Sequence, residues 1–163
     1  MNVDMLEECG IDATRAPVSI AELDEMAAKI SKRDASGKFN RVGFIPWLGN
    51  WYPAGWFWAF GSELYDANTK RPTLDKMENI KAFEWVQKYA QLYNPLDPGS
   101  GDSFLSGRLA MSADCSNPML RLLKTDRRDL KVRVVEVPHA PGGTQWNVVG
   151  RNRPHHTQRS TTS

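Results

Sequence analysis

PVSIAELDEMAAKISKRDASGKFNRVGFIP, residues 17–46, contains the pattern of a helix, a turn and a strand in succession. Ser19 and Glu22 form a capping box, in which each side chain accepts a hydrogen bond from the backbone amide of the other residue. Apolar residues then recur at helical spacing and predict a helix over residues 20–32 with one buried face: Ile20, Leu23, Met26, Ala27 and Ile30. The polar residues that follow predict a turn, and residues 41–45 predict a short buried strand that ends before a proline.

A long amphipathic helix is predicted over residues 76–93. Asp75 and Glu78 form a second capping box at its start, and its apolar stripe consists of Ala82, Phe83, Val86, Ala90 and Tyr93. Further along the chain, Asn117 before Pro118 is the pattern of an N-cap followed by a first-turn proline, and it predicts the start of a third helix.

Strand signals alternate with these helices. Apolar and charged residues alternate over residues 130–137, as in a strand with one wet face, and residues 146–149 predict a last strand. We expect residues 42–45 and 130–137 to share one small sheet, which the two longer helices cover. This mixture predicts an α/β architecture rather than a helical bundle or a β-sandwich.

Composition and charge exclude several classes of protein. The chain has 163 residues, of which 40% are hydrophobic and 25% are charged, the ordinary balance of a globular domain. Its formal net charge of +2 comes from residues 151–163, which carry three arginines and no acid. The nearly neutral body has no basic stripe, which argues against nucleic-acid binding. The first ten residues hold three acids and no apolar run, so they do not form a secretory signal, and no window reaches the ~20 apolar residues of a membrane span.

Motifs for catalysis, metals and cofactors are missing from the sequence. No GxSxG, HExxH or phosphate-loop pattern occurs, and Asp66 and His139 are explained as turn and loop residues. Cys9 and Cys115 belong to no CxxC or Cys/His pattern, so two small buried thiols are expected, with a disulfide left open. For His155 and His156, two solvated side chains are a simpler explanation than a metal-binding pair. We therefore predict no enzyme, no metal and no cofactor. A carbohydrate-active enzyme domain stays as the alternative, because a sequence does not show whether two carboxylates lie about 5 to 10 Å apart.

The densest aromatic stretch lies between residues 46 and 60: Trp47, Trp51, Tyr52, Trp56, Phe57, Trp58 and Phe60. Indole rings suit the apolar C–H faces of sugars, whereas core packing is the alternative reading for each ring. Trp51 is the best candidate for a ligand contact because it stands in the turn sequence GNWYP, and binding residues occur often in loops. Trp56, Phe57 and Phe60 are expected in the core. We predict ligand contacts from Trp51, Trp47, Asn50, Tyr52 and Asn117.

An ordered series of segments resembles the family 1 extracellular solute-binding proteins of ABC importers, which include the maltodextrin-binding receptors. These segments are GIDATRAPVSIAEL at 10–23, FGSELYD at 60–66, KRPTLD at 70–75 and FLSGRLAM at 104–111. The resemblance implies a type II, two-lobed α/β fold, of which this chain supplies mainly the second lobe as an internal fragment. Trp51 then falls where the family often has an aromatic residue that stacks on the sugar.

The family resemblance also implies a function. The full-length parent is expected to be a monomer that binds a carbohydrate, hands it to the membrane permease of an ABC importer and does no chemistry on it. Such a parent is periplasmic or an extracellular lipoprotein.

Three departures from the family pattern bear on this expectation. Residues 114–117 read DCSN where the family usually has a sugar-covering tryptophan, the loop between Tyr93 and Phe104 is short, and residues 151–163 are polar and aperiodic. We expect residues 1–150 to form a partial solute-binding lobe and residues 151–163 a disordered, out-of-frame tail. A non-functional remnant of a binding protein is a further alternative.

Overall fold

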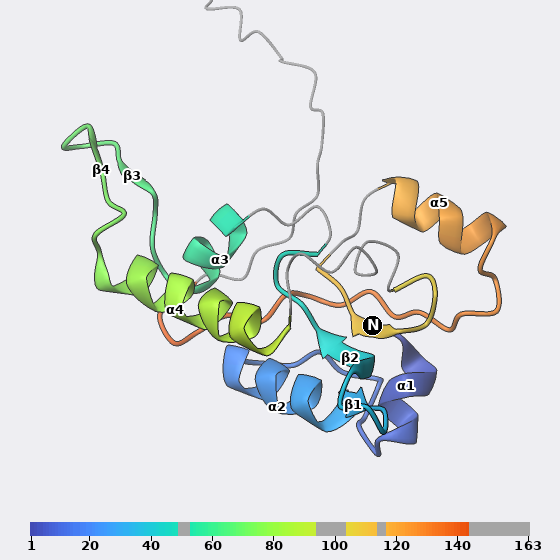
Figure 1. The fold of residues 1–163 in the computed structure, drawn as a ribbon. Coiled ribbons are helices and arrows are strands. Elements are labelled where there is room, and N and C mark those ends of the chain that lie inside the picture. Colours follow the sequence, from blue (N-terminus) through green and yellow to red (C-terminus); the bar gives the residue numbers. More distant parts are fainter. Residues whose placement is uncertain (49–52, 94–103, 114–116, 144–163) are drawn as a thin grey trace, which may run out of the picture.

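The computed structural model describes residues 1–48, 53–93, 104–113 and 117–143. Helices and strands are intermixed along this part of the chain (Figure 1). In order they are α1 (Val3–Glu8), α2 (Ile20–Ile30), β1 (Lys32–Arg33), β2 (Phe39–Phe44), α3 (Pro53–Ala59), β3 (Tyr65–Asp66), β4 (Arg71–Pro72), α4 (Met77–Leu92), β5 (Leu109–Met111) and α5 (Asn117–Thr125). The mixed α/β class predicted from the sequence is confirmed.

The main sheet has three strands in the order β1-β2-β5. β1 pairs antiparallel with β2, whereas β5 pairs parallel with β2, with Val42 opposite Leu109 and Phe44 opposite Met111. β3 and β4 form a separate antiparallel hairpin that projects from the body next to the start of α4 (Figure 1). The strand expected at residues 41–45 is therefore present as β2, and its parallel partner is β5.

The prediction that residues 130–137 join this sheet as a strand is wrong. In that segment only Val132 forms a β-bridge, an isolated antiparallel one with Asn2. The amide of Val3 donates to the carbonyl of Lys131 at 2.8 Å, and the amide of Arg133 donates to the carbonyl of Met1 at 2.9 Å. The first residues of the chain thus occupy the place next to residues 131–133. Alternation of apolar and charged residues indicates an extended segment with one wet face, but it does not indicate the pairing partner.

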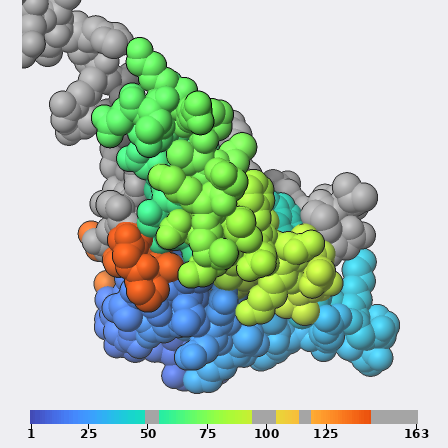
Figure 2. Space-filling view, turned by 90° about the vertical axis from the view of Figure 1, so that its left-hand side faces the viewer, coloured from blue at the N-terminus to red at the C-terminus, as the bar shows by residue number. Residues whose placement is uncertain are grey.

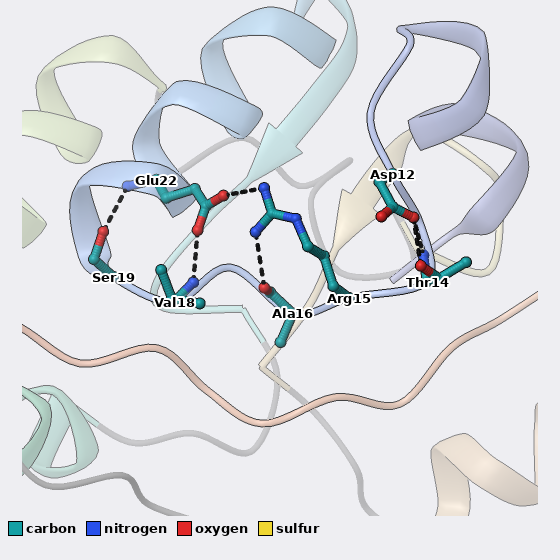
Figure 3. A network of polar contacts seen from close by, with 7 residues as sticks. All are labelled: Asp12, Thr14, Arg15, Ala16, Val18, Ser19 and Glu22. Atoms are coloured by element: carbon teal, nitrogen blue, oxygen red, sulfur yellow. Dashed lines mark hydrogen bonds and ion pairs between the residues drawn. The ribbon is translucent and has the colours of Figure 1, made fainter.

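The start of α2 largely follows the predicted capping box (Figure 3). The amide of Glu22 donates to Oγ of Ser19 at 3.1 Å, as expected. The carboxylate of Glu22, however, accepts from the amide of Val18 at 2.7 Å instead of from Ser19, and it pairs with Arg15 at 2.5 Å. The hydrogen bond from Arg15, followed by that from Val18, lowers the pKa of Glu22. The reach-back contact is therefore made one residue earlier in the chain than predicted.

The start and the buried face of α4 differ from the prediction. Lys76 occupies the N-cap position without a side-chain capping bond, so the capping box expected at Asp75 and Glu78 does not form. The buried residues of the helix are Asn79, Ala82, Trp85 and Tyr89, whereas Phe83 of the predicted stripe is 52% exposed. Trp85 and Tyr89 face the core because their polar atoms form hydrogen bonds with Asp24 of α2.

Aromatic rings fill the interface between the sheet, α3 and α4. Trp56 is 1% exposed, its ring centroid lies 4.7 Å from that of Trp85, and its indole N–H donates to the carbonyl of Pro46 at 2.9 Å. Phe57 is also buried, with its ring centroid 4.8 Å from that of Phe83, and Phe60 is partly buried against the hydrophobic core. The prediction that these three rings belong to the core is thus confirmed in full for the first two and in part for Phe60.

In Figure 2, α4 (green) lies directly against α2 (blue). Asp24 of α2 connects the two helices. One carboxylate oxygen, Oδ1, accepts from the indole N–H of Trp85 at 2.9 Å and from the hydroxyl of Tyr89 at 2.6 Å. The ammonium of Lys88 lies 3.4 Å from the other oxygen. Two helices that are far apart in sequence are therefore held by one carboxylate.

Tyr89 should make the protein lose stability at high pH. Burial, and next the hydrogen bond to Asp24, raise the pKa of its phenol above the ordinary value of 10.0. Above about pH 10 the unfolded chain therefore releases this proton while the folded chain keeps it, so the free energy of unfolding falls as the pH rises towards the folded pKa. Urea denaturation from about pH 9 to 11 should show a shallower fall for Tyr89→Phe than for the wild type. Equal slopes would contradict the assignment.

Candidate functional site

Two parallel strands end side by side and define the candidate site. β2 and β5 run in the same direction, and Phe44 and Met111 are register partners at their carboxyl ends. The segments that follow each strand therefore leave the sheet at the same edge. In open α/β sheets, ligands bind outside the carboxyl ends of parallel strands. We call residues 45–48 and 112–113, which directly follow β2 and β5, the strand-end edge.

The residues predicted to contact a ligand follow these two strands in the sequence. Trp47 belongs to the strand-end edge itself, three residues after the end of β2. Asn50, Trp51 and Tyr52 continue the same connection but lie outside the described residues. Asn117 is the first residue of α5, on the connection that follows β5, and its side chain is also outside the described part. The topology thus groups the predicted residues on two connections that start at one edge.

Trp47 differs from the other buried indoles of the described chain. Its ring is partly buried against the hydrophobic core. Its Nε1 atom is shielded from solvent and has no hydrogen-bond partner among the described residues. In contrast, Nε1 of Trp56 donates to Pro46 and Nε1 of Trp85 donates to Asp24. Buried polar groups in proteins are nearly always paired, so an unpaired indole N–H at this edge requires an explanation.

A small apolar cavity lies next to the strand-end edge but does not have the character of a sugar site. Its volume is about 70 Å³, and Phe44, Met111, Met119 and Leu123 are among the residues that line it. Small-molecule sites usually measure about 300–1,000 Å³ and carry convergent polar groups. We therefore interpret this cavity as a gap in the packing between the sheet, α5 and residues 132–138.

Asp66 and Cys9 show no sign of a catalytic or metal-binding role among the described residues. Asp66 accepts from the amides of Asn68 at 2.8 Å and Thr69 at 3.2 Å, which confirms its predicted role in a turn. Within the described ranges, no three His, Cys, Asp or Glu side chains gather as a metal site, and no helix has the length and apolarity to span a bilayer. Cys9 is a partly buried free thiol, whereas Cys115 lies outside the described residues.

Sequence reasoning missed β5, and with it the reason that the two connections share an edge. The only signal for this strand was the short apolar run Leu109-Ala110-Met111, whose three residues are all buried. A run of three apolar residues is too short to be distinguished from a turn of a buried helix. The strand was therefore visible only as part of a family-like segment, not as an element of structure.

Comparison with solved structures identifies proteins that this chain resembles in fold. CpMnBP1 with mannobiose bound superimposes with a TM-score of 0.76 at 30% sequence identity, over 88% of this chain and 39% of that chain. The same protein with mannotriose bound gives a TM-score of 0.72 at 30% identity, over 88% of this chain and 40% of that chain. The chain therefore spans about two fifths of the length of the protein that it matches.

A more distant structure shares the fold. An ABC transporter solute-binding protein from Thermotoga lettingae, bound with alpha-D-tagatose, superimposes with a TM-score of 0.51 at 21% identity, over 68% of this chain and 30% of that chain. The structural neighbours are two-lobed proteins, of which this chain covers a part. No family model and no curated protein matches the sequence.

Proposed function

We propose, on the premise that the chain is a part-length relative of the sugar-binding ABC-transporter solute-binding proteins, that it forms one wall of a carbohydrate-binding cleft. The observation that carries this proposal is the match over 88% of the chain to a protein with mannobiose bound. The wall is the strand-end edge together with the residues that follow it, where the predicted contacts Trp47, Asn50, Trp51, Tyr52 and Asn117 are grouped.

The proposed ligand is a neutral sugar or oligosaccharide, held by aromatic stacking and hydrogen bonds. A sugar with one apolar face loses water on that face when it stacks on an indole ring, while its hydroxyls bond to polar neighbours. Because the chain spans only 39% of the length of CpMnBP1, it supplies a part of the surface that surrounds a ligand in a whole receptor. Affinity depends on desolvating the ligand on several sides, so we expect binding by this chain to be weak.

In the proposed full-length protein, residues 1–150 form mainly the second of two lobes. That protein is a monomer outside the cytoplasmic membrane, and it delivers its ligand to the permease of an ABC importer. The ligand leaves unchanged. A carbohydrate-active enzyme with a similar aromatic cleft is distinguished by turnover: incubation with mannotriose should yield no shorter sugar.

Replacing Trp51 by alanine should weaken sugar binding without a comparable loss of stability. We expect calorimetric titration with mannobiose and mannotriose to show a loss of about 1 to 3 kcal/mol, the range that alanine substitution gives for aromatic residues stacked on nucleic-acid bases. Thermal unfolding should change much less, because an indole that faces a ligand fills no core cavity. Phe83→Ala is the matched control, since this aromatic side chain is 52% exposed on α4 and should leave affinity unchanged.

The opposite pattern would remove Trp51 from the site. A loss of about 3 to 5 kcal/mol in the free energy of unfolding, with unaltered affinity of the folded protein, is the signature of an emptied core position. Trp51 would then be a packing residue.

A further inference from the structure

We propose that Trp47 is a ligand-binding residue that acts through its indole N–H, which donates a hydrogen bond to a hydroxyl oxygen of the bound sugar. This inference rests on the proposed function. It names the indole N–H of Trp47 as the group that favours a ligand with a hydrogen-bond acceptor next to this residue. It differs from the stacking role assigned to Trp51, because it depends on one atom of the ring and not on its face.

The first support is the contrast between three indoles of the same chain. Trp56 and Trp85 each place Nε1 2.9 Å from an oxygen, whereas Nε1 of Trp47 has no partner among the described residues although it is shielded from solvent. A buried donor without an acceptor destabilises the folded state, so such a group persists where it has a further role or a partner that binds later. A bound ligand with an acceptor would remove this cost.

The second support is the rigid position of Trp47. The carbonyl of Pro46, the residue before it, accepts from Trp56, and the amide of Leu48, the residue after it, donates to the carbonyl of Ile45 at 3.3 Å. The backbone before Trp47 is thus fixed to a buried core residue, and the backbone after it is held by a local turn. A donor held by fixed neighbours loses little conformational freedom when a ligand binds.

The third support is the absence of charge at the described part of this edge. Residues 45–48 read IPWL and residues 112–113 read SA, so no cation of these six residues stands ready to pair with a carboxylate or phosphate. A neutral ligand with hydroxyl groups fits such surroundings better than an anion does. The indole N–H is a donor only, so it selects for an acceptor on the ligand.

Trp47→Phe tests this role because it removes the N–H and keeps an aromatic ring. Calorimetric titration with mannobiose and mannotriose should show an affinity about two- to tenfold lower, as expected for loss of one neutral hydrogen bond. The midpoint of thermal unfolding should stay the same or rise, since the unpaired donor is removed. Trp85→Phe is the matched control. It removes a paired N–H, so its unfolding midpoint should fall while its affinity is retained.

A series of monodeoxy mannobioses identifies the partner hydroxyl. One member should bind more weakly to the wild type than mannobiose does, and this difference should disappear in Trp47→Phe. If the wild type binds mannobiose and Trp47→Phe binds it equally well, the inference is overturned while the proposed function stands. A midpoint lowered as much as in Trp85→Phe, with affinity kept, would overturn it as well by revealing a structural acceptor. If the wild type binds neither mannobiose nor mannotriose, the proposed function and this inference fail together.

Discussion

Replacing Gly43 by alanine is expected to lower the free energy of unfolding by about 3 kcal/mol or more, at or above the upper end of the usual cost of overpacking. Gly43 lies in β2 where the strand crosses α2. A Cβ atom added there would lie 2.2 Å from the carbonyl oxygen and 2.4 Å from Cα of Ala27. Both atoms belong to the backbone of α2, so no side-chain rotation relieves the overlap. Urea denaturation of both proteins measures the effect.

Two further variants separate this overlap from other effects of a glycine. The double variant Gly43→Ala with Ala27→Gly should remain as unstable, because the overlap is with the backbone of residue 27 and not with its methyl group. Gly37→Ala tests backbone conformation alone, since Gly37 has φ of +82° and nothing within 4 Å of an added Cβ. Gly37→Ala should lower the free energy of unfolding by only about 1 to 2 kcal/mol. A cost at Gly43 no larger than at Gly37 would show that α2 and β2 are not packed so closely.

Local signals predicted the elements that depend on neighbouring residues. The apolar spacing of residues 20–30 and the Ser19 cap gave α2 within two residues of its observed end, and the Asn117-Pro118 pair marked the start of α5. Where a prediction needed a distant partner, it was less successful. Residues 130–137 have the pattern of a strand, but their neighbours are the first residues of the chain, which no local pattern relates to them.

The buried face of α4 could not be predicted for a similar reason. Hydrophobic spacing alone favoured Phe83, the more apolar residue, over Trp85 and Tyr89, which carry polar atoms. The structure buries the latter two because their N–H and O–H groups meet Asp24 of α2, about sixty residues away in sequence. Polar groups of aromatic residues are buried where a partner is available, and the partner is a tertiary feature.

The candidate site could be predicted in part. The aromatic density around Trp51 and the resemblance to sugar receptors pointed to the connection after β2 and to a carbohydrate ligand, and both stay predictions. Only the parallel pairing of β2 with β5 relates that connection to Asn117, because both strands end at the same edge. The unpaired Nε1 of Trp47 has no sequence signal, since its state depends on which acceptors the fold brings within reach.

Replacing Asp24 by alanine should destabilise the protein by about 3 to 5 kcal/mol, because two buried donors on α4 lose one charged acceptor. Trp85 is 7% exposed and Tyr89 is 5% exposed, so water does not readily replace the carboxylate. Asp24→Asn keeps an acceptor oxygen at the same place and should therefore lose less stability than Asp24→Ala. Lys88→Ala is the matched control for the exposed ion pair. Its ammonium lies 3.4 Å from Asp24 with the lysine side chain 67% exposed, and its removal should cost at most about 1 kcal/mol.

The three variants, compared by urea denaturation at neutral pH, distinguish hydrogen bonding from simple charge attraction. If the two hydrogen bonds hold α4 on α2, stability should decrease in the order Lys88→Ala, Asp24→Asn, Asp24→Ala. An equal loss in Lys88→Ala and Asp24→Ala would mean that the ion pair carries the stabilisation. A loss below about 1 kcal/mol in Asp24→Ala would mean that Trp85 and Tyr89 find other acceptors. Because this carboxylate joins α4 to α2, α4 should unfold locally before the sheet does when the carboxylate is removed. Hydrogen exchange of backbone amides should then be faster in α4 than in β2.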